Sequence, residues 1–297
     1  MDEAKPEGSL DAYEDAIIAG FRDYRVIDSA VARLQRRGFH VEELGMRFVR
    51  EKGHMIYMLE SPAVQNVTRI LVTTGAHGDE AECAYGLLSF LETFKPQNEQ
   101  LAVIPVTNPR AFVAGKTGIK YDFNRAFPED ASVDVDIAGD VPEAVKIVCK
   151  ALRGRRFDVH FDLHSDFEGK GFFVYERLAE KTKQAKSLAR RLVERLDEEG
   201  FRHNEEKSVS TRLIGNQRNY SGVVPSYRKE QTFEAYMAAR GVPFCYTLEF
   251  PEAALVERPD LQLKLVVRAL EMAVEESRRV FYPARIRKIL GYSETTK

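Results

Sequence analysis

The chain has 297 residues and a formal net charge of −2, with 30% charged and 44% hydrophobic residues. This balance is typical of a globular protein, and a chain of this length can bury a full hydrophobic core without disulfides. The near-neutral charge excludes the strongly basic surface that binds nucleic acid or an anionic membrane. Three well-separated cysteines, with no Cys-x-x-Cys motif, exclude a disulfide framework and a structural zinc site: Cys83, Cys149 and Cys245.

The amino-terminal segment is acidic and lacks the apolar region of a signal peptide. No run of residues approaches the about 18 apolar positions that a membrane-spanning helix needs. We therefore expect a cytoplasmic protein whose cysteines are buried and reduced. The sequence does not predict an oligomeric state.

Hydrophobic periodicity predicts alternating helices and strands. Residues 10–37 have the spacing of two helices, and residues 39–60 alternate as strands with turns at Gly45 and at 52–53. Further strands are predicted at 69–76, 101–106, 157–163, 171–175 and 243–250. Further helices are predicted at 79–94, 141–152, 177–199, 229–240 and 260–281. This alternation favours a single α/β domain with a mixed, mostly parallel central sheet flanked by helices.

Two long segments, 107–140 and 203–228, show little periodicity. Irregular loops of this length inside a compact domain are usually functional or mobile. Both segments are therefore candidates for lining a binding site. No internal repeat or low-complexity linker divides the chain.

Four side chains suited to metal chemistry stand at the ends of predicted strands. His77 and Glu80 follow the strand at 69–76 across a glycine-bracketed turn, and their i,i+3 spacing allows both to point at one site. His164 ends the strand pattern that begins at residue 157, and Glu249 lies near the end of the strand at 243–250. Because ligand sites in open α/β sheets gather at the carboxyl ends of strands, we expect these residues to meet.

Two imidazoles and one carboxylate are the protein ligands of an open catalytic zinc site, which keeps a fourth position for water or substrate. Glu249 would then be an unliganded base beside that water. Each residue also has a simpler interpretation, because His-x-x-Glu pairs are common by chance and a histidine at a strand end is more often a partly buried core residue. Glu249 could equally cap the edge of a strand. The joint placement of all four favours the metal site.

Five short motifs occur in order: GAHGDE at 75–80, NPRA at 108–111, DFNRAFP at 122–128, DLH at 162–164 and TLE at 247–249. In this order they resemble the zinc carboxypeptidase (M14-like) superfamily, including its succinylglutamate desuccinylase/aspartoacylase branch. The resemblance implies a zinc carboxypeptidase-like catalytic core over residues 61–297, with one zinc ion. Residues 1–60 would supply N-terminal helices and edge strands of the same domain.

The resemblance also implies a role for each of seven residues: zinc ligation for His77, Glu80 and His164, general-base catalysis for Glu249, orientation of His77 for Asp122, and binding of the substrate carboxylate for Asn124 and Arg125. The planar guanidinium of arginine pairs with a carboxylate through two hydrogen bonds, which lysine cannot imitate. The alternative for Arg125 is an ordinary surface ion pair.

One feature of the family pattern is missing. Family members usually carry a further arginine before the Asn-Arg motif, and this residue stabilises the developing oxyanion. The corresponding segment here, 115–121, reads GKTGIKY. Lys116 or Lys120 could supply a positive charge without the forked geometry, and either could equally be solvated.

Two further residues have expected roles in substrate binding. Tyr227 falls in the loop that carries a substrate-covering tyrosine in carboxypeptidases, with Tyr220 as a rival and an ordinary loop tyrosine as the alternative. Glu234 lies 15 residues before Glu249. In carboxypeptidases this place is the base of the side-chain pocket, where an acidic residue selects basic groups. The alternative is a solvated glutamate on the surface of the helix at 229–240.

The leading functional hypothesis is a zinc-dependent hydrolase that cleaves an amide bond next to a free carboxylate, in a small peptide or a cell-wall peptide. The runner-up is a deacylase of N-acyl amino acids of the succinylglutamate desuccinylase/aspartoacylase type. The deacylases carry a β-rich domain after the catalytic glutamate, whereas the segment after Glu249 has a helical pattern, which favours the carboxypeptidase type. A third possibility is a catalytically weak binding module, which the complete set of metal and base residues disfavours.

Overall fold

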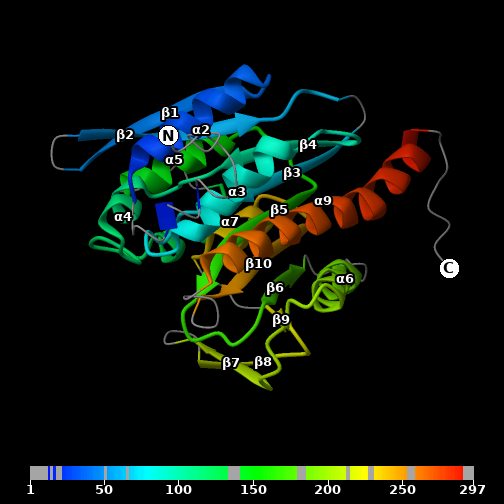
Figure 1. The fold of residues 1–297 in the computed structure, drawn as a ribbon. Coiled ribbons are helices and arrows are strands. Elements are labelled where there is room, and N and C mark those ends of the chain that lie inside the picture. The colour runs from blue at the N-terminus through cyan, green and yellow to red at the C-terminus, as the bar shows by residue number, and fades with distance from the viewer. Residues whose placement is uncertain are drawn as a thin grey trace, which may run out of the picture.

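An eight-stranded mixed sheet forms the centre of the computed structural model (Figure 1). In spatial order its strands are β1 (His40–Val49), β2 (Lys52–Glu60), β4 (Glu99–Ile104), β3 (Thr68–Thr73), β5 (Val159–Asp166), β10 (Phe244–Pro251), β6 (Phe173–Leu178) and β9 (Val223–Pro225). The structure describes residues 13, 16–17, 22–49, 52–64, 67–132, 141–178, 185–211, 215–226, 231–252 and 258–289.

The four central strands β4, β3, β5 and β10 run parallel, so their carboxyl ends meet at one edge of the sheet. The β1–β2 hairpin adds antiparallel strands on one side, where β2 pairs with β4. On the other side β6 pairs antiparallel with β10 and parallel with β9. The predicted α/β fold with a mixed, mostly parallel sheet is confirmed.

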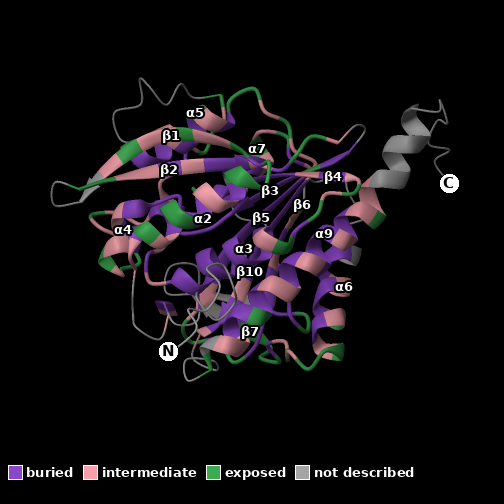
Figure 2. Ribbon diagram, turned by 45° about the horizontal axis from the view of Figure 1, so that its top comes forward, coloured by how far each residue is buried: buried purple, intermediate pink, exposed green. Residues whose placement is uncertain are grey.

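Helices cover both faces of the sheet (Figures 1 and 2). One face packs against α2 (Tyr24–Arg36), α3 (Ala81–Thr93), α6 (Ala185–Glu198) and α9 (Pro259–Ile289). The other face packs against α5 (Glu143–Leu152) and α7 (Phe233–Ala239), while α4 (Pro109–Ala114) lies beside the β1–β2 hairpin.

Side-chain alternation decides which face of the sheet carries polar groups. In β5, Val159, Phe161 and Leu163 enter the core beneath α3 and α9. The intervening residues are therefore turned to the face that α5 and α7 cover, and they are His160, Asp162 and His164. In β10 the same alternation turns Cys245, Thr247 and Glu249 to that face. The polar positions of two neighbouring buried strands thus share one side of the sheet.

The predicted elements differ from the observed ones mainly in the two long loops. The segment 203–228 contains a hairpin of β7 (Ser208–Thr211) and β8 (Gly215–Arg218) followed by β9, and the segment 107–140 contains α4 and the 3₁₀ turn η1 (Phe123–Arg125). Strands of three or four residues are too short to show a period of two, and β9 depends on its pairing with β6.

Several predicted helix boundaries also shift. Within the described residues, the helix predicted at 177–199 is found at Ala185–Glu198, and residues 177 and 178 instead extend β6 along β10. The last helix runs to Ile289. Of the first predicted helix, Tyr13, Ala16 and Ile17 are helical, and the rest lies outside the described residues. No helix in the described ranges combines the length and apolar character needed to cross a bilayer.

Most of the buried residues are apolar, and the buried polar ones include the three on β5 as well as Glu99 and Glu276 elsewhere in the domain. The three cysteines are buried and form no disulfide, as the sequence predicts. Helix starts follow local capping: the hydroxyl of Thr232 accepts a hydrogen bond from the backbone N–H of Ala235 at 3.2 Å, and the Asn108 side chain accepts one from Ala111. These caps begin α7 and α4.

Candidate metal centre

His77, Glu80 and His164 meet at the carboxyl edge of the parallel strands. One ligand atom from each lies within 4.8 Å of the other two. The Nδ1 atom of His77 is 2.6 Å from Glu80 Oε1, and the Nδ1 atom of His164 is 2.9 Å from Glu80 Oε2. Both imidazoles therefore direct their Nδ1 atoms at the carboxylate of Glu80. Two nitrogens and one oxygen converging in this way fit a divalent metal that prefers nitrogen and oxygen ligands.

The turn that carries His77 depends on a close backbone approach. A Cβ atom on Gly78 would lie 1.9 Å from the carbonyl carbon and oxygen of Ala111 in α4. Gly75, just before the turn, has φ +68°, a left-handed conformation that glycine adopts without strain. Glu80 is the N-cap residue of α3, but its side chain makes no capping hydrogen bond. Its carboxylate instead contacts the two imidazoles.

The far nitrogen of each imidazole contacts a second carboxylate. His77 Nε2 lies 3.1 Å from Asp122 Oδ1, and His164 Nε2 lies 3.1 Å from Asp162 Oδ2. A carboxylate that accepts the Nε2–H selects the tautomer in which Nδ1 carries the lone pair for a metal. Asp122 was singled out from the sequence for this contact, whereas Asp162 was not. The signal for Asp162 was available, because it stands two residues before His164 on the same face of β5.

The contacts of Asp162 extend into the interior. Thr73 Oγ1 donates to Asp162 Oδ1 at 2.6 Å and lies 2.8 Å from His160 Nε2. The hydroxyl of Thr73 has one proton, which it donates to Asp162. Its oxygen therefore accepts the hydrogen bond from the Nε2–H of His160. His160 is fully buried, and burial lowers its pKa to about 4, so its imidazole is neutral at pH 7. A continuous buried chain thus runs from His160 through Thr73 and Asp162 to His164.

The charges of the cluster favour an ionised Glu80. Burial opposes the charged form, but His77 and His164 outweigh it and lower the pKa of Glu80 to about 2. Burial also opposes the charged form of His77, yet Glu80 and Asp122 raise its pKa to about 10. A metal ligand must present a carboxylate or a neutral imidazole, so metal binding is expected to release protons from these histidines.

Glu249 lies beside the cluster and is not part of it. It stands directly opposite His164 in the β10–β5 ladder. Burial raises the pKa of Glu249 to about 8, and the negative charges of Glu80 and Asp166 add to this effect. A carboxyl group whose pKa lies near neutrality is suited to general acid–base chemistry.

Asn124 and Arg125 extend from the same turn as Asp122. Asn124 Nδ2 lies 3.2 Å from His164 Nε2, and its Oδ1 accepts the backbone N–H of Phe233 at 2.8 Å. Arg125 Nη1 donates to the backbone oxygen of Asn124 at 2.8 Å. Within the described ranges, Arg125 forms no ion pair with a carboxylate. The positive charge of Arg125 is near enough to Asp122 to help lower the pKa of that carboxyl group, against the opposing effect of burial.

The remaining residues singled out from the sequence lie in different settings. Lys116 is exposed, and its backbone oxygen accepts the N–H of Gly78 in the His77 turn at 2.9 Å. Lys120 is also exposed. Tyr227 lies outside the described residues, and Tyr220 is 47% exposed.

Glu234 is 5% exposed, which excludes the alternative of a solvated glutamate on the helix surface. It stands in α7, the helix that covers the polar face of β5 and β10.

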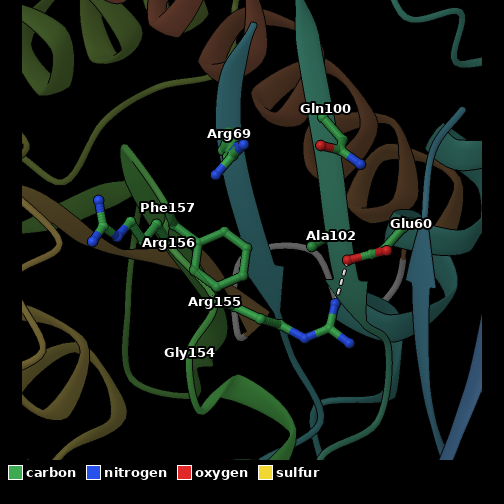
Figure 3. A pocket seen from close by; sticks show the side chains of 8 residues that line it. All are labelled: Glu60, Arg69, Gln100, Ala102, Gly154, Arg155, Arg156 and Phe157. Atoms are coloured by element: carbon green, nitrogen blue, oxygen red, sulfur yellow. Dashed lines mark hydrogen bonds and ion pairs between the residues drawn. The ribbon is translucent and has the colours of Figure 1, made fainter. Parts of the chain in front are cut away.

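A separate hollow lies at the opposite end of the sheet (Figure 3). Its volume is about 150 Å³, and its lining residues are Glu60, Arg69, Gln100, Ala102, Gly154, Arg155, Arg156 and Phe157. Arg69 and Gln100 stand at the amino ends of β3 and β4, whereas the metal cluster lies at the carboxyl ends. Arg155 forms an ion pair with Glu60 across this hollow. The hollow is therefore no part of the candidate metal centre.

The sequence matches the family model of the succinylglutamate desuccinylase/aspartoacylase catalytic domain over residues 66–269. This range contains His77, Glu80, His164 and Glu249. The chain belongs to the succinylglutamate desuccinylase/aspartoacylase family. No curated protein matches this sequence.

Solved structures share the fold of this family member. A proposed metallopeptidase from Shewanella amazonensis SB2B superimposes with a TM-score of 0.69 at 20% identity, over 86% of this chain and 93% of that one. A metallo-carboxypeptidase from Burkholderia cenocepacia has a TM-score of 0.58 at 17% identity, over 84% and 69% of the two chains. A metallo-carboxypeptidase from Pseudomonas aeruginosa, in complex with (2-guanidinoethylmercapto)succinic acid, has a TM-score of 0.60 at 18% identity, over 86% and 69%.

The superfamily expected from the five motifs is thereby confirmed, and the protein is a metallocarboxypeptidase-like hydrolase. The His77–Glu80–His164 group could hold a metal ion.

Proposed function

We propose that this desuccinylase/aspartoacylase family member is a zinc-dependent hydrolase that cleaves an amide bond next to a free carboxylate. The supporting observation is one arrangement: His77, Glu80 and His164 converge, Glu249 lies opposite His164, and Arg125 has no carboxylate partner among the described residues. A metal cluster alone is compatible with many reactions. The guanidinium of Arg125, which forms no ion pair within the described part of the chain, adds a binding group for an anionic substrate.

Each residue has a role in this proposal. A bound zinc ion would polarise the scissile carbonyl and make water a stronger acid, with a pKa of about 7. The Glu249 carboxylate takes the proton from the attacking water and passes it to the departing amine. Arg125 pairs with the substrate carboxylate and, with Asn124, fixes the amide bond relative to Glu249. Asp122 and Asp162 hold the two imidazoles with Nδ1 directed at the metal.

The donor set supports one zinc ion. Two histidine nitrogens and one carboxylate leave a fourth tetrahedral position open for water or substrate, as in catalytic zinc sites. The carboxylates of Asp122 and Asp162 are engaged by Nε2 atoms on the outer side of each ring, so they do not form a second ligand set.

The substrate is a small peptide or an N-acyl amino acid, and separate observations favour each. The Pseudomonas aeruginosa carboxypeptidase binds a succinic acid derivative, which supports recognition of a free carboxylate by the shared fold. The described residues after Glu249 form the long helix α9, as expected for the carboxypeptidase type. The family model instead favours the second candidate, a deacylase of N-acyl amino acids. Both reactions place the carboxylate on the amine side of the bond.

A substrate panel tests the proposal with the zinc-reconstituted protein. The panel contains short peptides and N-acyl amino acids, each with a free or an amide-blocked carboxylate. We expect hydrolysis only of the substrates that have a free carboxylate. In Glu249→Gln the rate of hydrolysis should fall by about 10²- to 10⁴-fold while zinc stays bound. The matched control is Glu199→Gln, an exposed carboxyl that pairs with Arg268.

Turnover of blocked and free substrates at equal rates would refute the carboxylate requirement. Zinc binding without hydrolysis of any panel member would instead favour the third possibility, a binding module. Loss of zinc in Glu249→Gln would make Glu249 a ligand and overturn its assignment as the base.

A further inference from the structure

An arginine from the amino-terminal part of the chain contacts the turn that carries His77 and Glu80. Arg22 Nε donates to the backbone oxygen of Gly78 at 2.8 Å, and Arg22 Nη2 donates to the backbone oxygen of Asp79 at 2.8 Å. These two oxygens belong to two of the three peptide groups that join His77 to Glu80. One planar guanidinium therefore binds the backbone between two of the proposed metal ligands.

The turn is also held by the loop that follows α4. The backbone N–H of Gly78 donates to the oxygen of Lys116 at 2.9 Å, and Thr117 Oγ1 donates to Asp79 Oδ2 at 2.6 Å. These contacts fix an N–H group and a side chain, whereas Arg22 fixes the two carbonyl groups. The turn is thus held from two sides by segments that are far apart in the sequence.

The start of α2 fixes the position of Arg22. Two residues later, the buried Tyr24 donates its hydroxyl to the backbone oxygen of Met55 at 2.6 Å. Its ring packs edge-on against Phe112 in α4, with ring centroids 6.0 Å apart. The side chain of Arg22 passes over Gly115, where an added Cβ atom would lie 3.1 Å from Arg22 Cδ. The guanidinium is therefore carried by a helix end that is itself anchored to the domain.

We propose that Arg22 is a positioning residue of the metal centre: it holds the peptide groups before Glu80 so that this carboxylate and the His77 imidazole reach one ion together. This inference rests on the proposed function. Glu80 begins α3 without a side-chain capping hydrogen bond, so the contacts of the turn have to fix its backbone. Groups that orient metal ligands typically contribute about 10- to 100-fold to metal affinity. Arg22 lies outside residues 66–269, the segment that the family model matches.

The charge of Arg22 would have the opposite effect on a metal ion. Burial raises the pKa of Glu252, as do the charges of Glu80 and Asp79, and the charge of Arg22 opposes this rise. The guanidinium is therefore within electrostatic reach of the carboxylates around the metal cluster. A cation at this distance repels a zinc ion. Loss of the charge alone would tighten zinc binding, whereas loss of the positioning contact would weaken it.

The test measures the zinc dissociation constant by competition with a chelator, at neutral pH and well below the unfolding temperature. In Arg22→Gln we expect this constant to rise by about tenfold or more. Arg22→Lys keeps the charge, but its single nitrogen does not reproduce the planar fork, so the constant should rise in this variant too. An unchanged or lower constant in folded Arg22→Gln overturns the proposal. If Arg22→Gln fails to fold, Arg22→Lys decides it, and wild-type affinity in that variant refutes the role of the two-carbonyl contact.

Arg37→Gln is the matched control. Arg37 follows the last turn of α2, and its Nη1 and Nη2 atoms donate to the backbone oxygens of Leu91 and Phe94 at 2.8 and 3.4 Å. It therefore makes the same kind of contact at the other end of α3, away from the metal cluster. Urea unfolding of the metal-free proteins measures how far each variant weakens the fold. We expect wild-type zinc affinity in Arg37→Gln, and an equal rise of the dissociation constant in both variants would overturn the proposal.

Zinc binding separates this inference from the proposed function, because it needs no turnover. Weaker zinc binding in the Arg22 variants supports the positioning role even if no panel substrate is hydrolysed. Hydrolysis of the panel by the wild type, together with wild-type zinc affinity in both Arg22 variants, refutes the positioning role and leaves the proposed function intact. A wild type that binds no zinc refutes both.

Discussion

The buried imidazole of His160 predicts a specific acid sensitivity of the fold. His160 is fully buried, contacts Thr73 through Nε2 and lies against the ring of Phe233, with ring centroids 4.9 Å apart. Its Nδ1 has no hydrogen-bond partner in the described part of the chain. Burial lowers the pKa of His160 from 6.5 to about 4. Between these pH values the imidazole is therefore protonated in the unfolded chain and neutral in the folded protein. The contribution of neutral His160 to the free energy of unfolding is therefore fully present above pH 6.5 and is lost as the pH falls toward 4.

The size of this loss follows from the two pKa values. At pH 7 the imidazole is mostly neutral in both states, so the effect is small. At pH 5 the unfolded imidazole is almost fully protonated and the folded one is almost fully neutral. With about 1.4 kcal/mol per pKa unit, the step from pH 7 to pH 5 removes about 2 kcal/mol of unfolding free energy.

His160→Gln should abolish this step, because the glutamine amide can donate to Thr73 and does not titrate. Urea unfolding of the metal-free protein at pH 7, 6 and 5, followed by circular dichroism, measures it. We expect the loss between pH 7 and pH 5 to be about 2 kcal/mol smaller in the variant than in the wild type. The exposed His40 supplies the control, and His40→Gln should follow the wild type. Equal losses in wild type and His160→Gln would refute the argument.

Three further changes test the metal centre and its support. His164→Ala should reduce zinc content from about one per chain to none by elemental analysis of reconstituted protein, and retained stoichiometric zinc would contradict its assignment as a ligand. Arg125→Lys should lower kcat/KM for free-carboxylate substrates by about tenfold or more, so that blocking the carboxylate as an amide costs the variant much less than the wild type, whereas equal losses in both proteins would place Arg125 away from the carboxylate. Gly78→Ala should weaken zinc binding and lower the unfolding midpoint, because its Cβ would overlap the backbone of Ala111 at 1.9 Å; unchanged affinity would show that the turn can move.

Local patterns in the sequence were sufficient for the central sheet and for the main candidate residues. The strands at 157–163 and 243–250 are predicted because buried parallel strands form apolar runs, and they are found as β5 and β10. His77, Glu80, His164 and Glu249 could be singled out because each stands at the end of such a strand. The roles of the metal ligands, of the base and of the carboxylate-binding residues Asn124 and Arg125 remain proposals. The structure brings the metal-binding group and Glu249 to one edge of the sheet.

The tertiary structure alone decided which polar groups are partners. Thr73 and His160 are separated by 87 residues, and Arg177 and Glu234 by 57, so no local period relates them. Strand register and helix packing bring each pair together: β3 pairs with β5, and α7 packs against β10 and β6. The charge of Glu234 could be read from the sequence, but its counter-ion could not, because a buried carboxylate is stabilised by whichever donors the fold places around it.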